Sequence, residues 1–338
     1  SSYNFPPMEP FMKHPPFKKL KISRFGIGTV QFGLDYGINN KTGQVSYSDV
    51  LNIFETALEN GVNFLDTSRV YGTSEETIGK ALREIGAVDD FIPCTKLDIS
   101  ENYHEKSDEA VRGEVKNSLR QSLEALRIDT IPVYLLHRPA HRTFRDGLIW
   151  DYLKEAATKG MIGRLGVSIA DGPSEAIECF KDPAVEAIQI PYNVFDARWD
   201  KAGILAGAAE RGIVVFNRSS YLKGLLLMEM DEVPEHVTES LCYKESLNQI
   251  AAEAGLDVKE LVLRYVFSVP EITSTIIGID SQAQFKENLR IYEKGPLEDA
   301  LNQRIKATFW DIPEYVLNPF LWDQRLLMLQ EQQQRRNA

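Results

Sequence analysis

One stretch decides the fold of this chain, residues 66–76, which read DTSRVYGTSEE. The short apolar run just before it predicts a buried strand that ends at Asp66. Thr73 and Glu76 have the spacing of a capping box, which predicts that a helix begins there. Tyr71 therefore lies in the turn between a strand and a helix, so its phenol and the Asp66 carboxylate can face one cleft.

Short apolar runs alternate with amphipathic stretches along the whole chain. The predicted strands are Phe25–Gly28, Val62–Leu65, Ile92–Thr95, Val133–Leu136, Leu165–Val167, Ala187–Ile190, Ile213–Phe216 and Thr275–Ile277. The predicted helices are Val50–Asn60, Glu75–Ile85, Asp108–Leu126, Leu148–Thr158, Ser174–Phe180, Ala202–Glu210, Ser246–Phe267 and Ser281–Tyr292. Strands that alternate with helices pair in parallel, and eight such units close a barrel, so the sequence predicts an α/β protein, a single-domain (β/α)8 TIM barrel.

The predicted barrel spans residues 20–294 and leaves a segment at each end. Residues 1–19 contain five prolines and no long apolar run, which is typical of a flexible arm and not of a signal peptide. Residues 295–338 are rich in aromatic residues and proline, so we expect an irregular extension that becomes disordered from Gln330 onward. Residues 219–246 form a long insertion after the seventh strand, on the face where barrel sites form, and could cover a bound cofactor.

The composition limits the classes of partner. The chain has 38 basic and 49 acidic residues, a net charge of -11, which argues against nucleic acid or an anionic membrane as partner. It contains no apolar run long enough to predict a membrane span. Three widely spaced cysteines are typical of a reduced, cytoplasmic setting. The sequence does not predict an oligomeric state.

Two further ionisable residues follow neighbouring strands, Lys96 and His137. Because the carboxyl ends of parallel strands meet at one face of a barrel, both are expected beside Asp66 and Tyr71. A lysine that ends an apolar strand is costly to bury unless it is paired, and Asp66 is the available partner. A phenol can act as a proton donor if a nearby cation lowers its pKa from about 10.

Each of these residues alone also has a structural interpretation. Asp66 could cap a turn, Tyr71 could be a packed aromatic residue, and His137 could be a core histidine. The four together favour a functional site. His137 and His141 have a spacing that would suit a metal on a helix, but Pro139 rules out a helix interior there, so we predict no metal site.

The stretch at 66–75, Lys96 and the run LLHRP at 135–139 together resemble the aldo-keto reductases. The resemblance continues to Asn288 and covers roughly residues 20–290. It implies that the family's catalytic tetrad is Asp66, Tyr71, Lys96 and His137. It also implies reduction of an aldehyde or ketone by NADP(H) or NAD(H). In that reaction Tyr71 protonates the oxygen, Lys96 lowers the pKa of Tyr71, Asp66 holds Lys96, and His137 orients the carbonyl.

The resemblance also implies cofactor contacts, although no G-x-G-x-x-G follows a strand to predict a Rossmann site. The implied contacts are Gly28 and Thr29 near the cofactor, Ser168 and Gln189 at its carboxamide, and Gly278, Gln284, Glu287 and Asn288 after the eighth strand. Ile169 stands where the family usually has asparagine. Arg218 falls where the family places a tyrosine that stacks on the nicotinamide, and a guanidinium plane can also stack. Alternatively Phe216 takes that place, or Arg218 is a surface residue.

The choice between the two dinucleotides depends on the segment after the eighth strand. Gly278 and Gln284 stand where relatives that prefer the phosphorylated form often carry basic residues. Ser281 and Gln284 also have capping-box spacing, so Gln284 could serve only to start a helix. Asp280 adds a negative charge. We therefore predict weak discrimination, with both forms used within about 100-fold of each other and the phosphorylated form as the better first guess.

Substrate pockets in this family come from variable loops, and here they carry several polar residues. These are Gln31, Asp35, Arg138, Asp196 and Arg198, which favour a hydroxylated, sugar-like aldehyde or ketone. A second class of function stays open, because some aldo-keto reductase relatives act mainly as cofactor-binding regulatory subunits of channels. A hydrolase would require paired carboxylates or a metal group, and the predicted strand ends offer neither.

Overall fold

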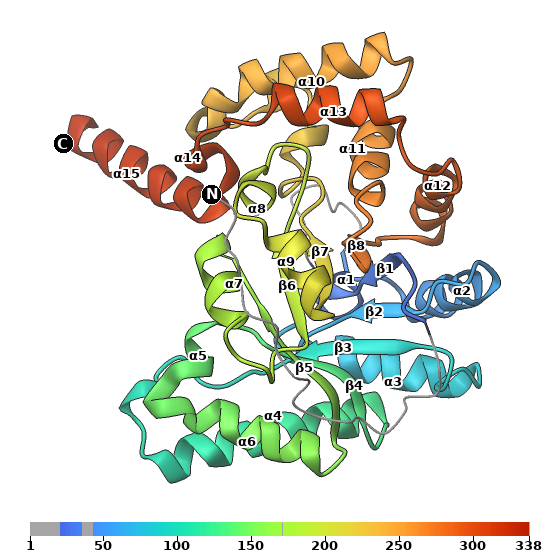
Figure 1. Cartoon of the computed structure of the whole chain (residues 1–338), viewed down its shortest axis with the longest axis vertical. Helices are drawn as coiled ribbons and strands as arrows, with labels where there is room; N and C mark the ends of the chain where they lie inside the picture. The colour runs from blue at the N-terminus through green and yellow to red at the C-terminus, as the bar shows by residue number, and fades with distance from the viewer. Residues whose placement is uncertain (1–20, 36–42, 171, 338) are drawn as a thin grey trace.

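The chain folds as a closed barrel of eight parallel strands (Figure 1). The computed structural model describes residues 21–35, 43–170 and 172–337. The strands are β1 Phe25–Gly28, β2 Phe64–Asp66, β3 Ile92–Lys96, β4 Ile131–Leu136, β5 Ile162–Ser168, β6 Ala187–Pro191, β7 Val214–Arg218 and β8 Ser274–Gly278. The barrel is closed because β1 pairs with both β2 and β8. This confirms the predicted (β/α)8 architecture.

Helices surround the barrel, mostly one after each strand (Figure 1). The outer helices are α2 Tyr47–Glu59, α3 Ser74–Glu84, α4 Asp108–Leu126, α6 Leu148–Thr158, α7 Pro173–Cys179, α9 Ile204–Arg211, α11 Val258–Phe267 and α12 Gln282–Glu293. Shorter helices lie in the loops that leave the strands: α1 Val30–Gly33, α5 Ala140–Thr143 and α8 Arg198–Lys201. No helix among the described residues has both the length and the apolar character needed to cross a membrane.

The single helix expected over 246–267 is wrong, because two helices occupy this region. The first, α10, spans Leu241–Glu253, and Gly255 then adopts a left-handed φ of 68°. The Asp257 side chain accepts a 2.7 Å hydrogen bond from the backbone N–H of Glu260 and so caps the start of α11. A glycine stop followed by an aspartate cap is a complete break between helices.

The start of α3 also differs from expectation. Thr73 is the residue before the helix, but its side chain makes no capping hydrogen bond. Its hydroxyl instead accepts a hydrogen bond from Gln44, and Glu76 pairs with Arg69. The predicted helix is therefore correct and the predicted capping box is wrong, because both of its side chains have other partners.

The carboxyl-terminal extension is helical, so the expectation of an irregular backbone is wrong. It forms α13 Asp299–Thr308, α14 Glu314–Leu317 and α15 Pro319–Asn337. In Figure 1, α15 extends away from the body of the molecule. Pro319 suits the first turn of a helix, and leucine, glutamine and arginine are good helix formers, which explains why this segment is helical. The expected amino-terminal arm, residues 1–19, lies outside the described residues.

The insertion after β7 consists mainly of short turns of 3-10 helix. These are η3 Leu225–Leu227, η4 Met230–Glu232 and η5 Glu235–Ser240. Lys244, which is buried on α10, donates hydrogen bonds of 2.8 Å to the carbonyl oxygens of Leu225 and Met228. A buried ammonium therefore holds the insertion against α10.

Alternate strand residues point into the barrel and set up the site. The apolar cluster inside the barrel contains Phe64, Ile92, Cys94, Val133, Leu135, Ala187, Phe216 and Ile276. Side chains along a strand alternate between faces with a period of two residues. One period beyond these residues lie, in chain order, Asp66, Lys96, His137, Gln189, Arg218 and Gly278. The polar residues expected at the site therefore share the inner face at the carboxyl ends of the strands.

Candidate active site

A buried ion pair between Lys96 and Asp66 forms the base of the site. The Lys96 ammonium is 2.7 Å from Asp66 Oδ1 and also donates a 2.8 Å hydrogen bond to the Thr67 carbonyl oxygen. The Lys96 side chain is only 1% exposed. Burial alone would lower the pKa of Lys96, but the Asp66 carboxylate, with a further contribution from Tyr71, outweighs it and raises this pKa above its ordinary value. The lysine therefore stays charged, and the predicted pairing is confirmed.

Tyr71 lies directly beside this ion pair. The Lys96 ammonium is 5.3 Å from the centroid of the Tyr71 ring. The attraction between the two groups is mutual, so a cation at this distance stabilises a Tyr71 phenolate. This is the arrangement that a phenol needs to give up its proton.

Two close glycine contacts hold the loop that carries Tyr71. A Cβ atom added to Gly33 would stand 1.8 Å from the Tyr71 carbonyl oxygen, and one added to Gly72 would stand 2.3 Å from the Gly33 carbonyl oxygen. Gly72 also has a left-handed φ of 57°. Arg69, in the same loop, pairs with the buried carboxylate of Glu75. Sequence reasoning did not single out Gly33 or Gly72, because only the packed backbone reveals why a side chain is excluded there.

His137 follows β4 and faces the same cleft. Its Nδ1 lies 3.5 Å from the Ser68 hydroxyl oxygen. Burial, together with the positive charges of Lys96 and Arg218, lowers the pKa of His137 to about 4. The imidazole is therefore neutral at neutral pH, when it can donate one hydrogen bond and accept another.

Gln189 and Ser168 form a second polar contact with the ion pair. Gln189 Nε2 donates a 2.6 Å hydrogen bond to Asp66 Oδ1, and the Ser168 hydroxyl donates a 3.3 Å hydrogen bond to Gln189 Oε1. The sequence placed both residues only at the cofactor's carboxamide. Their contact with Asp66 was missed because it depends on the barrel bringing β6 opposite β2, which no local pattern reveals.

Arg218 ends β7 on the inner face, where it is half-buried. Its guanidinium donates hydrogen bonds to the Ile169 carbonyl oxygen (3.2 Å) and to the Ser219 hydroxyl (3.3 Å). Phe216, the alternative stacking residue, is fully buried and stacks on Phe64 with ring centroids 4.4 Å apart. Phe216 is therefore part of the barrel core, which leaves Arg218 as the stacking candidate.

The rim between β1 and β8 has features that fit a dinucleotide. Gly28 lies opposite Gly278, and a Cβ on Gly28 would stand 3.3 Å from the Gly278 Cα. The side chain of Gln31 packs against Gly278, where an added Cβ would stand 3.1 Å from its amide nitrogen. Buried acceptor oxygens of Gln31, Asp280 and Asn288 have no hydrogen-bond partner among the described residues. Amine and hydroxyl groups of a nucleoside are donors that could satisfy such oxygens.

The residues that begin α12 contact one another. The Ser281 hydroxyl accepts a 3.2 Å hydrogen bond from the backbone N–H of Gln284, as a capping residue does. The Gln284 side chain accepts a 2.7 Å hydrogen bond from the backbone N–H of Asp280 and donates to the Asp280 carboxylate (3.3 Å). Gln284 is thus a helix-start residue, as one interpretation held. Glu287 pairs with Lys259 on α11 at 2.8 Å.

Thr29, which follows β1, contacts the strand that ends in Asp66. Its hydroxyl donates a 2.9 Å hydrogen bond to the Asp66 carbonyl oxygen.

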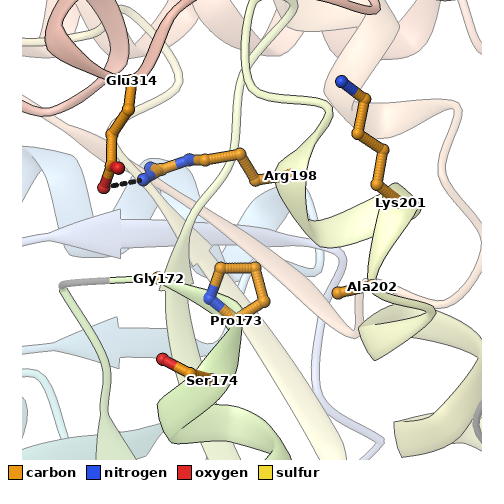
Figure 2. Close-up of a pocket in the computed structure, with 7 residues that line it drawn as sticks. All are labelled: Gly172, Pro173, Ser174, Arg198, Lys201, Ala202 and Glu314. Carbon is orange, nitrogen blue, oxygen red and sulfur yellow. Dashed lines mark hydrogen bonds and ion pairs between the residues drawn. The ribbon is translucent and has the colours of Figure 1, made fainter.

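Three of the five polar residues expected in a substrate pocket, Asp196, Arg198 and Arg138, form ion pairs. A cavity of about 510 Å³ is lined by Gly172, Pro173, Ser174, Arg198, Lys201, Ala202 and Glu314. Figure 2 shows these residues as sticks. Asp196 binds two nitrogens of Arg198 at 2.8 Å each, and Glu314 on α14 binds a third at 3.2 Å. No tetrad residue lines this cavity. Arg138 pairs with Glu101, so of these expected residues Gln31 alone offers a buried acceptor without a partner in the described chain.

No group of three or more histidine, cysteine, aspartate or glutamate side chains able to hold a metal was found in residues 21–35, 43–170 and 172–337. His141 is buried beside Tyr103, with ring centroids 4.8 Å apart, and burial lowers its pKa to about 4. Of the two histidines whose spacing was noted in the sequence, His137 therefore lies neutral at the cleft and His141 lies neutral and buried beside Tyr103.

A parallel barrel whose carboxyl rim joins a buried lysine–carboxylate pair to a tyrosine and a neutral histidine is suited to oxidoreductase chemistry. The model of the aldo/keto reductase family matches residues 24–308. The chain belongs to this family and is an oxidoreductase.

Individual relatives agree with this placement. The "Uncharacterized oxidoreductase YqkF" of Bacillus subtilis is 27% identical over 289 residues, which cover 80% of this chain and 87% of the relative. The "Probable voltage-gated potassium channel subunit beta" of Arabidopsis thaliana is 23% identical over 312 residues, which cover 83% and 92%. Among solved structures, the holo form of aldo-keto reductase AKR11C1 from Bacillus halodurans gives a TM-score of 0.67 at 25% identity, with 85% of this chain and 92% of that chain covered.

Proposed function

We propose that this protein reduces an aldehyde or ketone to an alcohol with a reduced nicotinamide dinucleotide, and that Tyr71 is the general acid. One observation carries the proposal: the buried Lys96 ammonium is 2.7 Å from Asp66 and 5.3 Å from the Tyr71 ring centroid. A fixed cation beside a phenol stabilises the phenolate that remains after proton transfer. Asp66 in turn keeps the lysine in place and compensates its charge.

The bound dinucleotide supplies a hydride to the carbonyl carbon. Tyr71 gives its proton to the oxygen, which becomes the alcohol, and the Tyr71 phenolate is held by Lys96. Neutral His137 donates a hydrogen bond to the same oxygen and so orients the carbonyl. A histidine whose pKa is about 4 keeps this donor form at neutral pH without adding a charge.

The cofactor would lie across the rim from the Ser168–Gln189 pair to α12. Ser168 and Gln189 would hold the carboxamide, Arg218 would stack on the ring, and the glycines of β1 and β8 would allow close approach. The unpartnered oxygen of Asn288 fits the amine of an adenine. The Asp280 carboxylate would weaken the binding of a 2′-phosphate beside the start of α12, so we propose that both NADPH and NADH are used.

The substrate class we propose is a small hydroxylated carbonyl compound. The buried, unpartnered oxygen of Gln31 supports a ligand that brings a hydroxyl donor to the rim. Paired charges at Arg198 and Arg138 give no support for a strongly anionic substrate.

The test is a panel of carbonyl compounds assayed by loss of reduced-nicotinamide absorbance with NADPH and with NADH. The matched variant is Tyr71→Phe, which removes only the hydroxyl. It should lower turnover by about 100-fold or more, the usual scale of general acid catalysis, and leave cofactor affinity nearly unchanged. Equal turnover in the variant and the parent would refute the role of Tyr71.

A second candidate function is a cofactor-binding regulatory subunit, because one relative is named as a potassium channel subunit beta. The same assay separates the two functions. A regulatory module would complete about one turnover and then release its oxidised cofactor very slowly, whereas a reductase would sustain many turnovers at saturating substrate.

A further inference from the structure

The side-chain amide of Gln189 donates a hydrogen bond to the ion pair that lies beside Tyr71. Its amide nitrogen is 2.6 Å from Asp66 Oδ1, and the Lys96 ammonium is 2.7 Å from that same oxygen. Gln189 is 1% exposed and Asp66 is 5% exposed. One carboxylate oxygen thus accepts two short hydrogen bonds away from water, where such bonds to an ionised group are strong.

The Gln189 amide is fixed at both ends. Its oxygen accepts a hydrogen bond from Ser168, and the strand register places Ser168 beside Gln189. The resulting chain of contacts runs from Ser168 through Gln189 to Asp66 and then to Lys96, whose ammonium faces the Tyr71 ring. A change in the orientation of one amide therefore acts on the charge beside Tyr71.

We propose that Gln189 is a positioning residue that couples occupancy of the nicotinamide site to the protonation of Tyr71. The inference rests on the proposed function, because it takes the ligand of the Ser168–Gln189 pair to be the carboxamide of a nicotinamide dinucleotide. A carboxamide at this position draws the Gln189 amide away from Asp66. The carboxylate then loses a hydrogen bond, its charge is less compensated, and Tyr71 holds its proton more firmly.

The direction of this coupling suits reduction. Other titratable or charged groups surround the ion pair: Lys96 interacts with both Asp66 and Tyr71, Cys94 on β3 interacts with Asp66 and Lys96, and His137 after β4 interacts with Lys96 and with Arg218 from β7. None of them contacts both Asp66 and Ser168 through one amide, as Gln189 does. Binding of a nicotinamide dinucleotide then favours the phenol, the form that can donate a proton. By reciprocity, protonation of Tyr71 favours binding of the reduced cofactor.

The first experiment titrates Tyr71 in the cofactor-free protein by NMR of 13C-labelled tyrosine, with the resonance assigned from Tyr71→Phe. Gln189→Met keeps the length of the side chain and removes its N–H donor. The midpoint of the Tyr71 titration should rise by about half a pH unit or more. Gln121→Met, on the exposed face of α4, is the matched control and should leave the midpoint unchanged. An unchanged or lower midpoint in Gln189→Met would overturn the proposal.

The second experiment needs no variant at Gln189. The dissociation constants of NADPH and NADH, measured by fluorescence across pH, should increase by about threefold or more through the Tyr71 titration, and should stay flat in Tyr71→Phe. A flat profile in the parent protein would also overturn the coupling. Neither measurement requires turnover, so a protein that reduces no carbonyl compound would refute the proposed function alone. An active enzyme in which Gln189→Met leaves the midpoint of the Tyr71 titration unchanged would refute this inference alone.

Discussion

At the carboxyl end of the barrel interior the inward side chains are ionisable or polar, whereas at the amino end of the same strands they are mostly apolar. On β2 the inward side chain changes from apolar Phe64 to Asp66 within two residues. On β3 the inward side chain changes from Ile92 to Lys96 within four residues. Phe64 stacks on Phe216 in the apolar part. In barrel enzymes the carboxyl end carries the chemistry and the amino end carries stability, and this chain follows that division within a few residues.

Cationic side chains also have different partners at the two ends of the barrel. Arg24, at the amino end, donates 2.9 Å hydrogen bonds to the carbonyl oxygens of Phe267 and Val269, at the end of α11. It lines, with Arg164 and Ile92, a cavity of about 1010 Å³. Lys96, at the carboxyl end, is held by a carboxylate and faces a phenol. A cation that binds backbone carbonyls stabilises a helix end, whereas one that links a carboxylate to a phenol can influence proton transfer.

The largest effect is expected when the buried Lys96 loses its carboxylate partner. Asp66→Asn removes the negative charge and leaves a buried ammonium with only neutral partners. We expect the free energy of unfolding to fall by about 3–5 kcal/mol, the range for breaking a buried ion pair, and turnover to fall as well. Urea denaturation followed by circular dichroism measures the first effect. A loss under 1 kcal/mol would mean that water reaches Lys96 in the folded protein.

The next largest effect concerns His141, a buried ionisable group without a charged partner of opposite sign among the described contacts. Its pKa is about 4 when folded, against 6.5 as its ordinary value. The unfolded chain therefore binds more protons between these values, so the stability is complete above about pH 6.5 and is lost as the pH falls towards 4. The loss should reach up to about 3 kcal/mol.

His141→Gln should remove this part of the pH dependence. The control is His104→Gln, since His104 is 62% exposed and should have no such effect. Denaturation midpoints of the three proteins, compared between pH 4 and pH 7, measure the difference. If the denaturation midpoints of His141→Gln and the parent changed with pH in the same way, His141 would have its ordinary pKa in the folded protein.

Two arginines on the inner face give a sharper comparison of the ends. Arg218→Ala, at the carboxyl end, should weaken dinucleotide affinity by about 1–2 kcal/mol if its guanidinium stacks on the nicotinamide. Arg164→Ala, at the amino end, is the matched control and should leave affinity unchanged. Fluorescence titration with NADPH measures both. Unchanged affinity in Arg218→Ala would assign the stacking to another residue.

The barrel was predictable because its strands are buried on both faces and appear in the sequence as short apolar runs. The clustering of Asp66, Lys96 and His137 was predictable because each residue follows such a run, and parallel strands bring their ends together. The break between α10 and α11 was missed although Gly255 and Asp257 mark it, because the apolar periodicity continues across the break.

Other features depend on tertiary packing and have no local signal. The hydrogen bond from Gln189 to Asp66 joins residues 123 positions apart. The need for glycine at Gly33 arises only where the loop after β2 packs against α1. The failed capping box has a similar cause, because Gln44 and Arg69 compete for Thr73 and Glu76. Local patterns predict the elements and tertiary contacts decide which side chains meet.

The smallest expected effect tests whether the two ends are independent. Ile92→Val removes one methylene from the inner face at the start of β3, beside an existing cavity. We expect the free energy of unfolding to fall by about 0.5–1.5 kcal/mol, as for other isoleucine-to-valine changes, and turnover to stay within about twofold. The backbone of β3 is held by β2 and β4, so the position of Lys96 should not change. Denaturation and a steady-state assay measure the two effects. A tenfold loss of turnover at this small loss of stability would show that packing at the amino end positions Lys96, and the division between the two ends would then be wrong.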